Sequence, residues 1–262
     1  MPSLSAARFS SVITAAAAIF FCGLTSIAVG ADLPGLAPAV VATLGKMQKT
    51  LSASQFSFQA HTLRAYAGPN GELLHIEHVI KATIKRPDHL VADVTGDDGA
   101  SKFFYDGRTL TLFGEQQKQY AAVPVTGTIA DMLDTAQDRL DIDFPLAGLL
   151  NNKPDETLVS DAAIGGQVGT ATIDGVRCNH YFFMDAPDLD LELWVEDNDK
   201  ALPRRVIVTY RSLPGRPTFV ADLSNWDFSV HPTDAEFAFH APAGVSQVEL
   251  KPSSRAIPAS TK

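Results

Sequence analysis

Residues 74–85 read Leu-His-Ile-Glu-His-Val-Ile-Lys-Ala-Thr-Ile-Lys and carry the clearest strand pattern of the chain. Leu74, Ile76, Ile80, Ala82 and Ile84 lie on one face of this stretch. The odd-numbered positions between them are mostly polar. Because successive side chains of a strand point to opposite faces, one face is expected to pack inward and the other to meet water.

The same two-residue alternation recurs on both sides of this stretch. Upstream, Phe56, Phe58 and Ala60 alternate with polar neighbours. Downstream, Asp106-Gly107 is typical of a tight hairpin turn, and Gly165–Gly169 is interpreted as a plain turn. The other segments with strand patterns are 90–94, 103–105, 110–113, 120–123, 169 onward, 188–196, 202–211, 219–230 and 237–239. Together they predict about ten strands, mostly antiparallel, in a mainly β (α+β) domain.

Three segments follow a helical period instead. Apolar residues from Leu36 to Leu51 are spaced three or four apart and predict an amphipathic helix over 35–53. Thr128 and Asp131 resemble a capping box before an apolar stripe that includes Met132, which predicts a second helix over 128–140. A short third helix is predicted around 144–150.

The first 31 residues have the features of an export signal. They contain one positive charge, Arg8, then an apolar run, and they end in Val29-Gly30-Ala31. Small residues at the last and third-last positions suit signal peptidase, so cleavage after Ala31 is expected. A lipoprotein signal ending at Cys22 is disfavoured because Phe20 and Phe21 precede the cysteine. An uncleaved membrane anchor is the other alternative, since about 18 apolar residues just span a bilayer.

Removing residues 1–31 from the 262-residue chain leaves 231, which we interpret as one β domain over 32–250 and a polar, disordered tail over 251–262. The formal charge changes from −9 to −10, because the signal holds one basic and no acidic residue. An acidic chain without a basic patch is not expected to bind nucleic acid. The domain is expected to be a monomer. Cys178 is then the one remaining cysteine and is interpreted as a small buried hydrophobe.

No motif predicts catalysis, a metal site or a cofactor. His75-Ile76-Glu77-His78 is the densest group of metal-capable side chains, but on a strand His78 faces away from the other two. The acidic stretch 188–196 is followed by Arg205 and Arg211, and cross-strand pairing places Arg205 opposite Trp194 and Arg211 opposite Asp188. Ion pairing and cation–aromatic stacking on a solvated face explain these charges.

Seven short motifs carry a resemblance to a known family. They are Arg86-Pro87-Asp88-His89-Leu90, Phe104 to Leu110, Gly127-Thr128-Ile129, Phe144 to Ala147, Asp174-Gly175, Leu202-Pro203-Arg204-Arg205 and Trp226. From about Leu36 to Val248 the chain resembles a bacterial family of predicted periplasmic proteins of unknown function, within the superfamily of LolA-like lipoprotein carriers and lipoprotein-binding folds.

This resemblance implies a strongly curved, incomplete antiparallel β-barrel with two or three helices covering its concave face. It also implies a periplasmic, non-enzymatic binding or carrier protein with an apolar cavity for a lipid or for the acyl chain of a lipoprotein. The side chains expected to line that cavity are Phe56, Phe58, Ile76, Ile80, Leu112 and Met132. The alternative is an envelope sensor or interaction module that acts through contacts with a protein partner. The strand pattern alone leaves a β-sandwich open as well.

Overall fold

The computed structural model describes residues 35–68, 70–140, 142, 144–150, 159, 164–185 and 188–249. All of them belong to one compact unit of the chain, Pro34–Lys262. The predicted signal over 1–31 and the predicted tail over 251–262 lie outside the described residues. None of the helices in the described part has both the length and the apolar character that a membrane crossing needs.

The described residues form three α-helices, one 3-10 helix and a 12-stranded sheet. The helices are α1 (Pro38–Leu51), α2 (Ile129–Leu140), α3 (Ala147–Leu150) and the 3-10 helix η1 (Asp234–Phe237). The first strands are β1 (Gln55–Ala67), β2 (Leu73–Lys85), β3 (His89–Gly96), β4 (Gly99–Asp106), β5 (Thr109–Gly114) and β6 (Gln119–Pro124). The later strands are β7 (Ile164–Ile173), β8 (Val176–Asp185), β9 (Leu189–Glu196), β10 (Pro203–Tyr210), β11 (Thr218–Asp227) and β12 (Ser246–Gln247).

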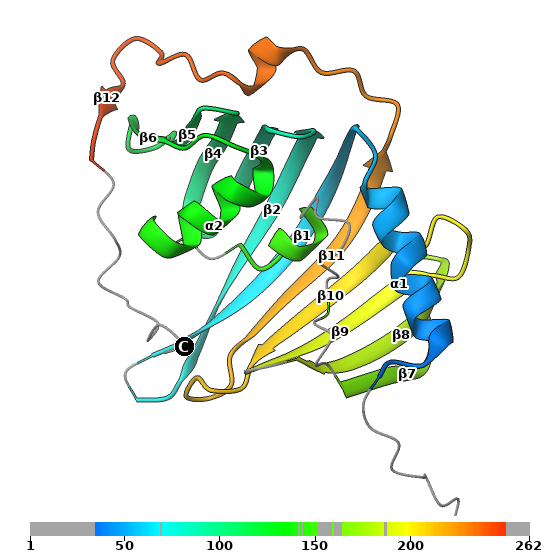
Figure 1. Cartoon of the computed structure of the whole chain (residues 1–262). Coiled ribbons are helices and arrows are strands. Elements are labelled where there is room, and N and C mark those ends of the chain that lie inside the picture. The colour runs from blue at the N-terminus through cyan, green and yellow to red at the C-terminus, as the bar shows by residue number, and fades with distance from the viewer. Residues whose placement is uncertain are drawn as a thin grey trace, which may run out of the picture. The chain divides into compact units, whose positions relative to one another are not determined.

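Two antiparallel meanders make up the sheet. β1 to β6 form one, β7 to β11 form the other, and the pairing of β1 with β11 joins them. The short β12 pairs in parallel with β6 at one edge, and β7 forms the other edge. The sheet curves without closing, and α1, α2 and α3 lie on its concave side (Figure 1). The predicted incomplete antiparallel barrel with helices on the concave face is confirmed.

The core lies between this concave face and the helices. α1 buries Val40, Leu44, Met47 and Leu51, which are the predicted helical stripe. α2 likewise buries its apolar stripe, and both helices pack into one hydrophobic cluster with the inward residues of the sheet. The spacing read from the sequence therefore corresponds to the faces that the helices bury.

The strand predicted at 237–239 is wrong. Residues 234–237 form η1, which begins with a capping box in which Thr233 and Glu236 exchange hydrogen bonds between side chain and backbone. Phe239 follows and packs its ring against Phe104 and Phe113, on the convex face of the sheet. Two aromatic residues spaced two apart look like a strand, but here they anchor a segment that crosses the sheet.

The interpretation of Gly165–Gly169 as a turn is also wrong, because these glycines lie within the edge strand β7. A Cβ atom on Gly165 would sit 2.1 Å from the carbonyl oxygen of Phe182, so β8 approaches too closely for any larger residue. The register shifts between Gln167 and Gly169, which forms a bulge at Val168. Glycine here permits close strand pairing and a bulge.

The predicted cross-strand contacts of β9 and β10 are confirmed. Arg205 pairs with Trp194 in register, and its guanidinium lies 5.9 Å from the indole centroid. The Arg211 backbone N–H donates to the carbonyl of Asp188, while its side chain pairs with the carboxylate of Asp190 at 3.4 Å. The charged side chains of these strands therefore interact with partners within the sheet, as the ion-pair interpretation expects.

Cys178 is fully buried in β8. Burial raises the pKa of its thiol above the ordinary value, with the carboxylate of Glu196 acting in the same direction. A thiol that stays protonated is a poor nucleophile, so the interpretation as a small buried hydrophobe is confirmed.

Tyr105 links β4 to the segment before α2. Its side chain is fully buried and its hydroxyl donates a 2.7 Å hydrogen bond to the carbonyl of Gly127. Burial, reinforced by the carboxylates of Asp88 and Asp131, raises the pKa of Tyr105 to about 12. The hydroxyl therefore keeps the proton that it donates well above neutral pH.

Stability is expected to fall at alkaline pH because of this tyrosine. An unfolded tyrosine ionises near pH 10, so the contribution of the neutral Tyr105 is complete below about pH 10 and is lost as the pH rises toward 12. The loss is at most about 1.4 kcal/mol per pH unit. Urea unfolding between pH 8 and 11 should show a smaller decline for Tyr105→Phe than for the wild type. Parallel declines would contradict the assignment.

Candidate ligand-binding site

The sheet register places five of the six predicted cavity residues on the concave face. Phe58 pairs with Ala82, and the same row continues through Ala92 and Phe103 to Leu112 on β5. Phe56 lies on one side of this row, opposite Ile84 of β2. Ile80 and Ile76 lie on the other side of the row, also on β2. The sixth residue, Met132, lies on the buried stripe of α2. The sequence pattern thus identified one continuous inward surface.

The burial of these residues divides them into two groups. Phe56 is 0% exposed, Met132 1% and Phe58 5%, so neighbouring side chains fill the space around them. Ile80 and Leu112 are partly buried against the core, and Ile76 is half-buried. A ligand could touch the first group only after the side chains around it move, whereas the second group is already partly accessible. Their role in binding stays a prediction.

An aromatic cluster lies on the concave face around Phe56 and Phe58 of β1. The ring of Phe56 lies 6.0 Å from that of Trp226 and 5.6 Å from that of Phe228. Phe58 stacks on Trp226 at 4.8 Å. The indole nitrogen of Trp226 donates to the carbonyl of Pro203, which satisfies its polar atom. Trp226 belongs to the resemblance motifs, but nothing in its local pattern predicted these neighbours.

Arg86, at the end of β2, connects two helices to this cluster. Its Nη1 donates to the carbonyl of Leu150 at 2.8 Å, and its Nη2 donates to that of Leu51 at 3.0 Å. These are the last residues of α3 and α1, where carbonyls lack partners within the helix. The guanidinium also lies 5.7 Å from the centroid of Phe56, and burial lowers the pKa of Arg86 below its ordinary value.

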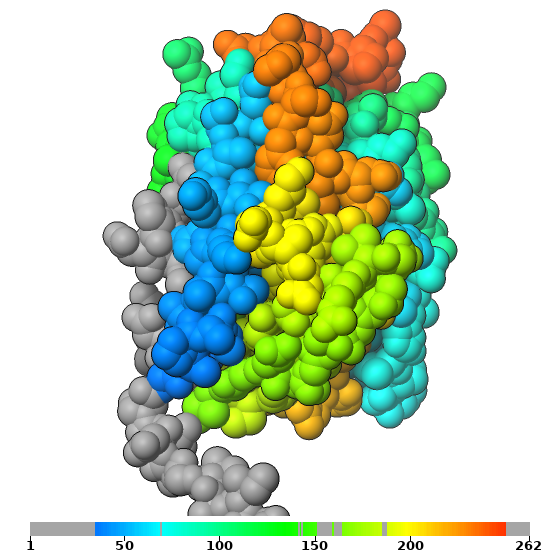
Figure 2. Space-filling view, turned by 90° about the vertical axis from the view of Figure 1, so that its right-hand side faces the viewer, coloured from blue at the N-terminus to red at the C-terminus, as the bar shows by residue number. Residues whose placement is uncertain are grey.

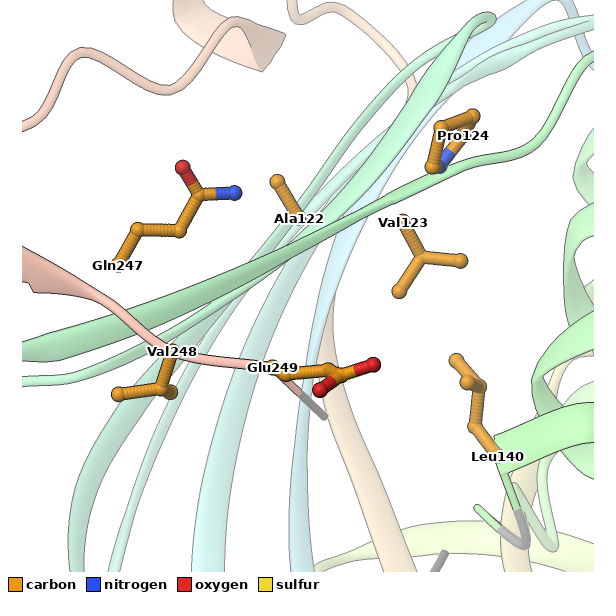
Figure 3. A pocket seen from close by; sticks show the side chains of 7 residues that line it. All are labelled: Ala122, Val123, Pro124, Leu140, Gln247, Val248 and Glu249. Carbon is orange, nitrogen blue, oxygen red and sulfur yellow. The ribbon is translucent and has the colours of Figure 1, made fainter. Parts of the chain in front are cut away.

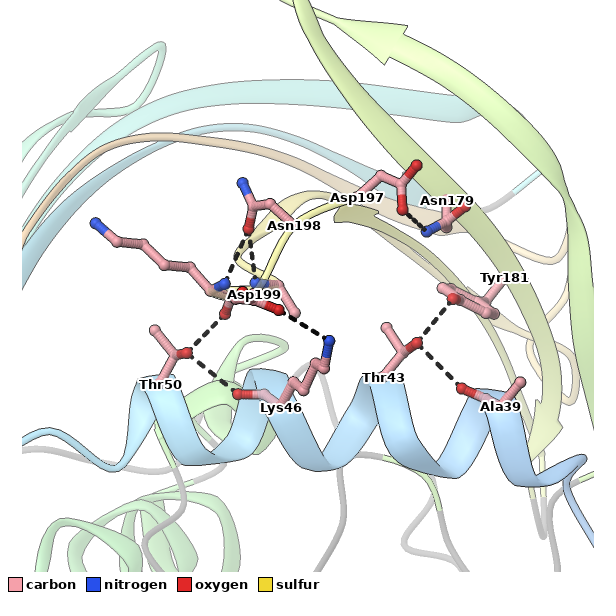
Figure 4. A network of polar contacts seen from close by, with 11 residues as sticks. Ala39, Thr43, Lys46, Thr50, Asn179, Tyr181, Asp197, Asn198 and Asp199 are labelled. Atoms are coloured by element: carbon pink, nitrogen blue, oxygen red, sulfur yellow. Dashed lines mark hydrogen bonds and ion pairs between the residues drawn. The ribbon is translucent and has the colours of Figure 1, made fainter.

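Few polar contacts hold α1 to the other half of the sheet. Tyr181 donates to the hydroxyl of Thr43, and Thr50 donates to the carbonyl of Lys200 in the turn between β9 and β10 (Figure 4). Lys46 pairs with Asp199 at 3.2 Å in the same turn, beside which α1 lies in Figure 2. Exposed pairs of this kind contribute little, so apolar packing is the main attachment of the helix.

The concave face is less well covered toward the far ends of β1 and β2. Leu74 is 60% exposed and Tyr66 37%, and Ile76 and Ile80 are half-buried between them and the core. All four side chains continue the inward faces of their strands. We call these four residues the open end of the concave face. A large exposed Leu beside an aromatic ring and two half-buried Ile side chains is suited to contact with an apolar ligand.

A separate cleft of about 500 Å³ lies beside β6 and β12, at one edge of the sheet (Figure 3). It is lined by Ala122, Val123, Pro124, Leu140, Gln247, Val248 and Glu249. Its lining mixes polar and apolar groups, and none of the six predicted cavity residues belongs to it. The pairing of β12 with β6 creates this cleft, and no sequence pattern indicated that pairing.

The polar side chains near the open end are paired. His78 lies on the concave face and contacts Asp98 at 2.8 Å, whereas Glu77 faces the other way and lies 3.7 Å from His61. Within the described residues, no three His, Cys, Asp or Glu side chains are placed to hold one metal ion. Arg64, which follows Thr62 on the inward face of β1, is a charge that the prediction overlooked. Its even position on the alternating strand was the available signal.

The chain is similar to several solved structures. No curated protein is significantly similar to the chain in sequence. The solved structures that resemble it include an uncharacterized conserved protein from Thermus thermophilus, with TM-score 0.47 and 10% identity over 80% of this chain and 99% of that one. The lipoprotein LppX from Mycobacterium tuberculosis gives TM-score 0.44 and 13% identity over 74% and 98% of the two chains. A LolA superfamily protein from Nitrosomonas europaea gives 0.38 and 13% over 76% and 97%.

A family model matches far more directly. It carries the description "Predicted periplasmic protein (DUF2092)" and covers residues 41–251. This range includes every strand of the sheet and both helix-to-sheet contacts of Arg86. The chain therefore belongs to this family of predicted periplasmic proteins.

Proposed function

We propose that this protein is a non-enzymatic binding or carrier protein of the periplasm, which holds a lipid or an acylated ligand against the concave face of its sheet. The observation that supports this most directly is the open end, where Leu74 is 60% exposed although the inward residues that follow it along β2 are half-buried or buried. An acyl chain lying there would cover Leu74, Ile76 and Ile80. The family description agrees with the proposed compartment.

For useful affinity, the protein must shield much of the acyl chain from water. Each methylene moved out of water contributes about 0.8 kcal/mol, so ten of them contribute about 8 kcal/mol. Association opposes this with roughly 4–15 kcal/mol of lost freedom. The open end alone is short, and a ligand of ordinary length would also need space beneath the helices. The helix α2 around Met132 then acts as a lid that moves aside.

The attachment of α2 is compatible with such movement. Between the sheet and the start of α2, one backbone bond runs from the Ile129 N–H to the carbonyl of Pro87, and the Tyr105 hydroxyl binds Gly127. Both lie at the beginning of the helix. The remainder is held by the apolar stripe of α2, and contacts of that kind can be replaced by an acyl chain of similar character.

Organic extraction of the protein purified from its native compartment, followed by mass spectrometry, tests the proposal. A carrier should retain about one lipid per chain. If the predicted signal is removed, the intact mass should be that of a chain that begins at Asp32. Protein that is free of lipid in both extraction and native mass spectrometry would contradict the carrier function. Retention at far below one equivalent would also contradict it.

Ile80→Asp is expected to abolish lipid retention. A carboxylate at this inward, half-buried position would have to lose its water against an acyl chain, which is strongly unfavourable. Val79→Asp is the matched control, because Val79 is the adjacent residue on the opposite face. Retention should persist in Val79→Asp, with circular dichroism confirming that both variants fold. Equal retention in the two variants would remove Ile80 from the site.

The alternative function, an envelope interaction module, is favoured by a different observation. The edge strand β7 spans ten residues without an ionisable side chain, and its Val168 is 62% exposed. Natural sheets commonly protect such edges with charges, and an uncharged edge can pair with an extended partner segment. Lipid-free protein in the extraction experiment would make this alternative the better one.

A further inference from the structure

The strand β7 forms an edge of the sheet that has no neighbour among the described strands (Figure 1). The other edge is partly covered, because β12 pairs with β6. Natural sheets commonly protect an edge with charges or proline, but the ten residues of β7 include neither. A bulge at Val168 is the protective feature that is present, and residues 169–173 after it pair regularly with β8. We call residues 169–173 the β7 edge.

The backbone groups of Thr170 and Thr172 point away from the sheet. Ile173 and Val176 flank a two-residue turn, 174–175, whose φ angles of 48° and 78° are typical of a tight hairpin. The flanking residues of such a turn form a hydrogen-bonded pair, and these pairs alternate along an antiparallel ladder. Positions 169, 171 and 173 therefore bond to β8. The N–H and C=O groups of the two exposed threonines face the other way.

The sequence of the β7 edge is self-complementary. It reads Gly169-Thr170-Ala171-Thr172-Ile173, so an antiparallel second copy centred on Ala171 places Thr170 opposite Thr172 in both directions. The outward backbone groups of these threonines then bond reciprocally across the contact. Gly169 comes to lie opposite Ile173 of the second copy. A Cβ atom on Gly169 would have no contact within 4 Å in the single chain, so there is room beside it for that side chain.

We propose that two copies of this chain associate through their β7 edges into one continuous antiparallel sheet, with a two-fold axis at Ala171. Charge supports a contact at this place. Two copies of an acidic chain repel each other, and a strand without ionisable side chains adds no like charges to the contact. Threonine pairs across antiparallel strands are also favourable. Because the contact is short, the dimer is expected to be weak and to depend on concentration.

The dimer differs from the monomer that the sequence leads us to expect. It does not depend on lipid binding, because none of the six predicted cavity residues lies on β7. A second copy would occupy the same edge that the alternative function assigns to an extended partner segment. The self-complementary sequence of the β7 edge is the reason to prefer a second copy.

Sedimentation equilibrium of the mature chain over a range of concentrations tests the association. The average mass of the wild type should rise toward that of a dimer. Thr170→Pro removes an outward N–H from each copy and leaves the bonds to β8 in place, so association should weaken at least about 10-fold. Thr170→Val is the matched control, because it keeps the N–H and the branched shape, and association should stay within about threefold. Circular dichroism confirms that both variants fold.

A cysteine at the two-fold axis tests the register. Ala171 faces its own copy at a Cα separation of about 4.5 Å, which a disulfide can span, so Ala171→Cys should cross-link two chains on mild oxidation. The background is Cys178→Ala, because Cys178 lies opposite Ala171 within the same chain. Val41→Cys in the same background is the control. Val41 is 54% exposed on α1, and a cysteine there should leave the chains separate.

The outcomes separate this inference from the proposed function. A wild type that stays monomeric at every concentration refutes the dimer, and so does equal association of Thr170→Pro and the wild type. Equal cross-linking of Ala171→Cys and Val41→Cys refutes the pairing at Ala171. A monomer that retains lipid refutes only the dimer, whereas a dimer free of lipid refutes only the carrier function. Should Thr170→Pro fail to fold, the wild-type masses and the cross-linking still decide the question.

Discussion

Phe56→Ala is expected to lower the free energy of unfolding by about 3–5 kcal/mol, as for other large aromatic residues removed from a core. Phe56 is 0% exposed and contacts the rings of Trp226 and Phe228 as well as the guanidinium of Arg86. Because three different elements meet at this ring, the cavity left by alanine cannot close by moving one side chain. Urea unfolding at neutral pH measures the change directly.

Phe104→Ala is the matched control for this prediction. Phe104 is half-buried on the convex face, where its ring contacts Phe239. Its removal should lower stability by less than half as much, since water already reaches part of the ring. If Phe56→Ala is no more destabilising than Phe104→Ala, the space around Phe56 is loosely filled. That result would place Phe56 among the ligand contacts and not in the permanent core.

The strands of the first meander could be predicted because their two faces differ strongly. In β2 the apolar residues from Ile76 to Ile84 sit at even positions, and the residues between them meet solvent or the convex face. The helices were equally clear, because α1 and α2 bury the stripe that a 3.6-residue period selects. Local patterning fixes which face points inward, and this is how the five inward sheet residues were found.

Long-range pairing left no comparable signal. Nothing in the pattern of β1 indicates that β11 would pair with it, although this contact joins the two meanders. The first half of β7 was missed because its glycines suggest a turn, whereas the close approach of the Phe182 backbone requires glycine at position 165. Residues 237–239 were misassigned because Phe237 and Phe239 alternate like a strand while they pack on the convex face.

The candidate site was predicted only in its apolar part. The six expected residues are inward-facing, yet the charged groups among them, Arg64 and Arg86, received no role. An arginine at an inward position contradicts the simple rule that inward residues are apolar, and such exceptions commonly mark function or a specific structural contact. The contact made by Arg86 depends on two helix ends that are far apart in sequence, so the local pattern could not reveal it.

Arg86→Met is expected to destabilise the protein by about 2–4 kcal/mol, because it leaves two helix-terminal carbonyls without their charged donor. The Leu51 carbonyl ends α1 and the Leu150 carbonyl ends α3, and the guanidinium bridges them at 3.0 and 2.8 Å. A cation at helix C-termini also interacts favourably with the helix dipole. At neutral pH the guanidinium remains charged although burial lowers its pKa, so these bonds offset the loss of its hydration.

Arg86→Lys distinguishes the two-pronged contact from charge alone. Lysine retains the charge but cannot hold both carbonyls in the planar fork of arginine, so it should recover less than half of the lost stability. Met preserves most of the aliphatic volume, which keeps the packing on Phe56. Hydrogen exchange should show faster opening of the last turn of α1 in Arg86→Met than in the wild type, while β2 keeps its protection. If exchange in α1 is unchanged and stability falls by less than about 1 kcal/mol, Arg86 does not fasten the helices to the sheet.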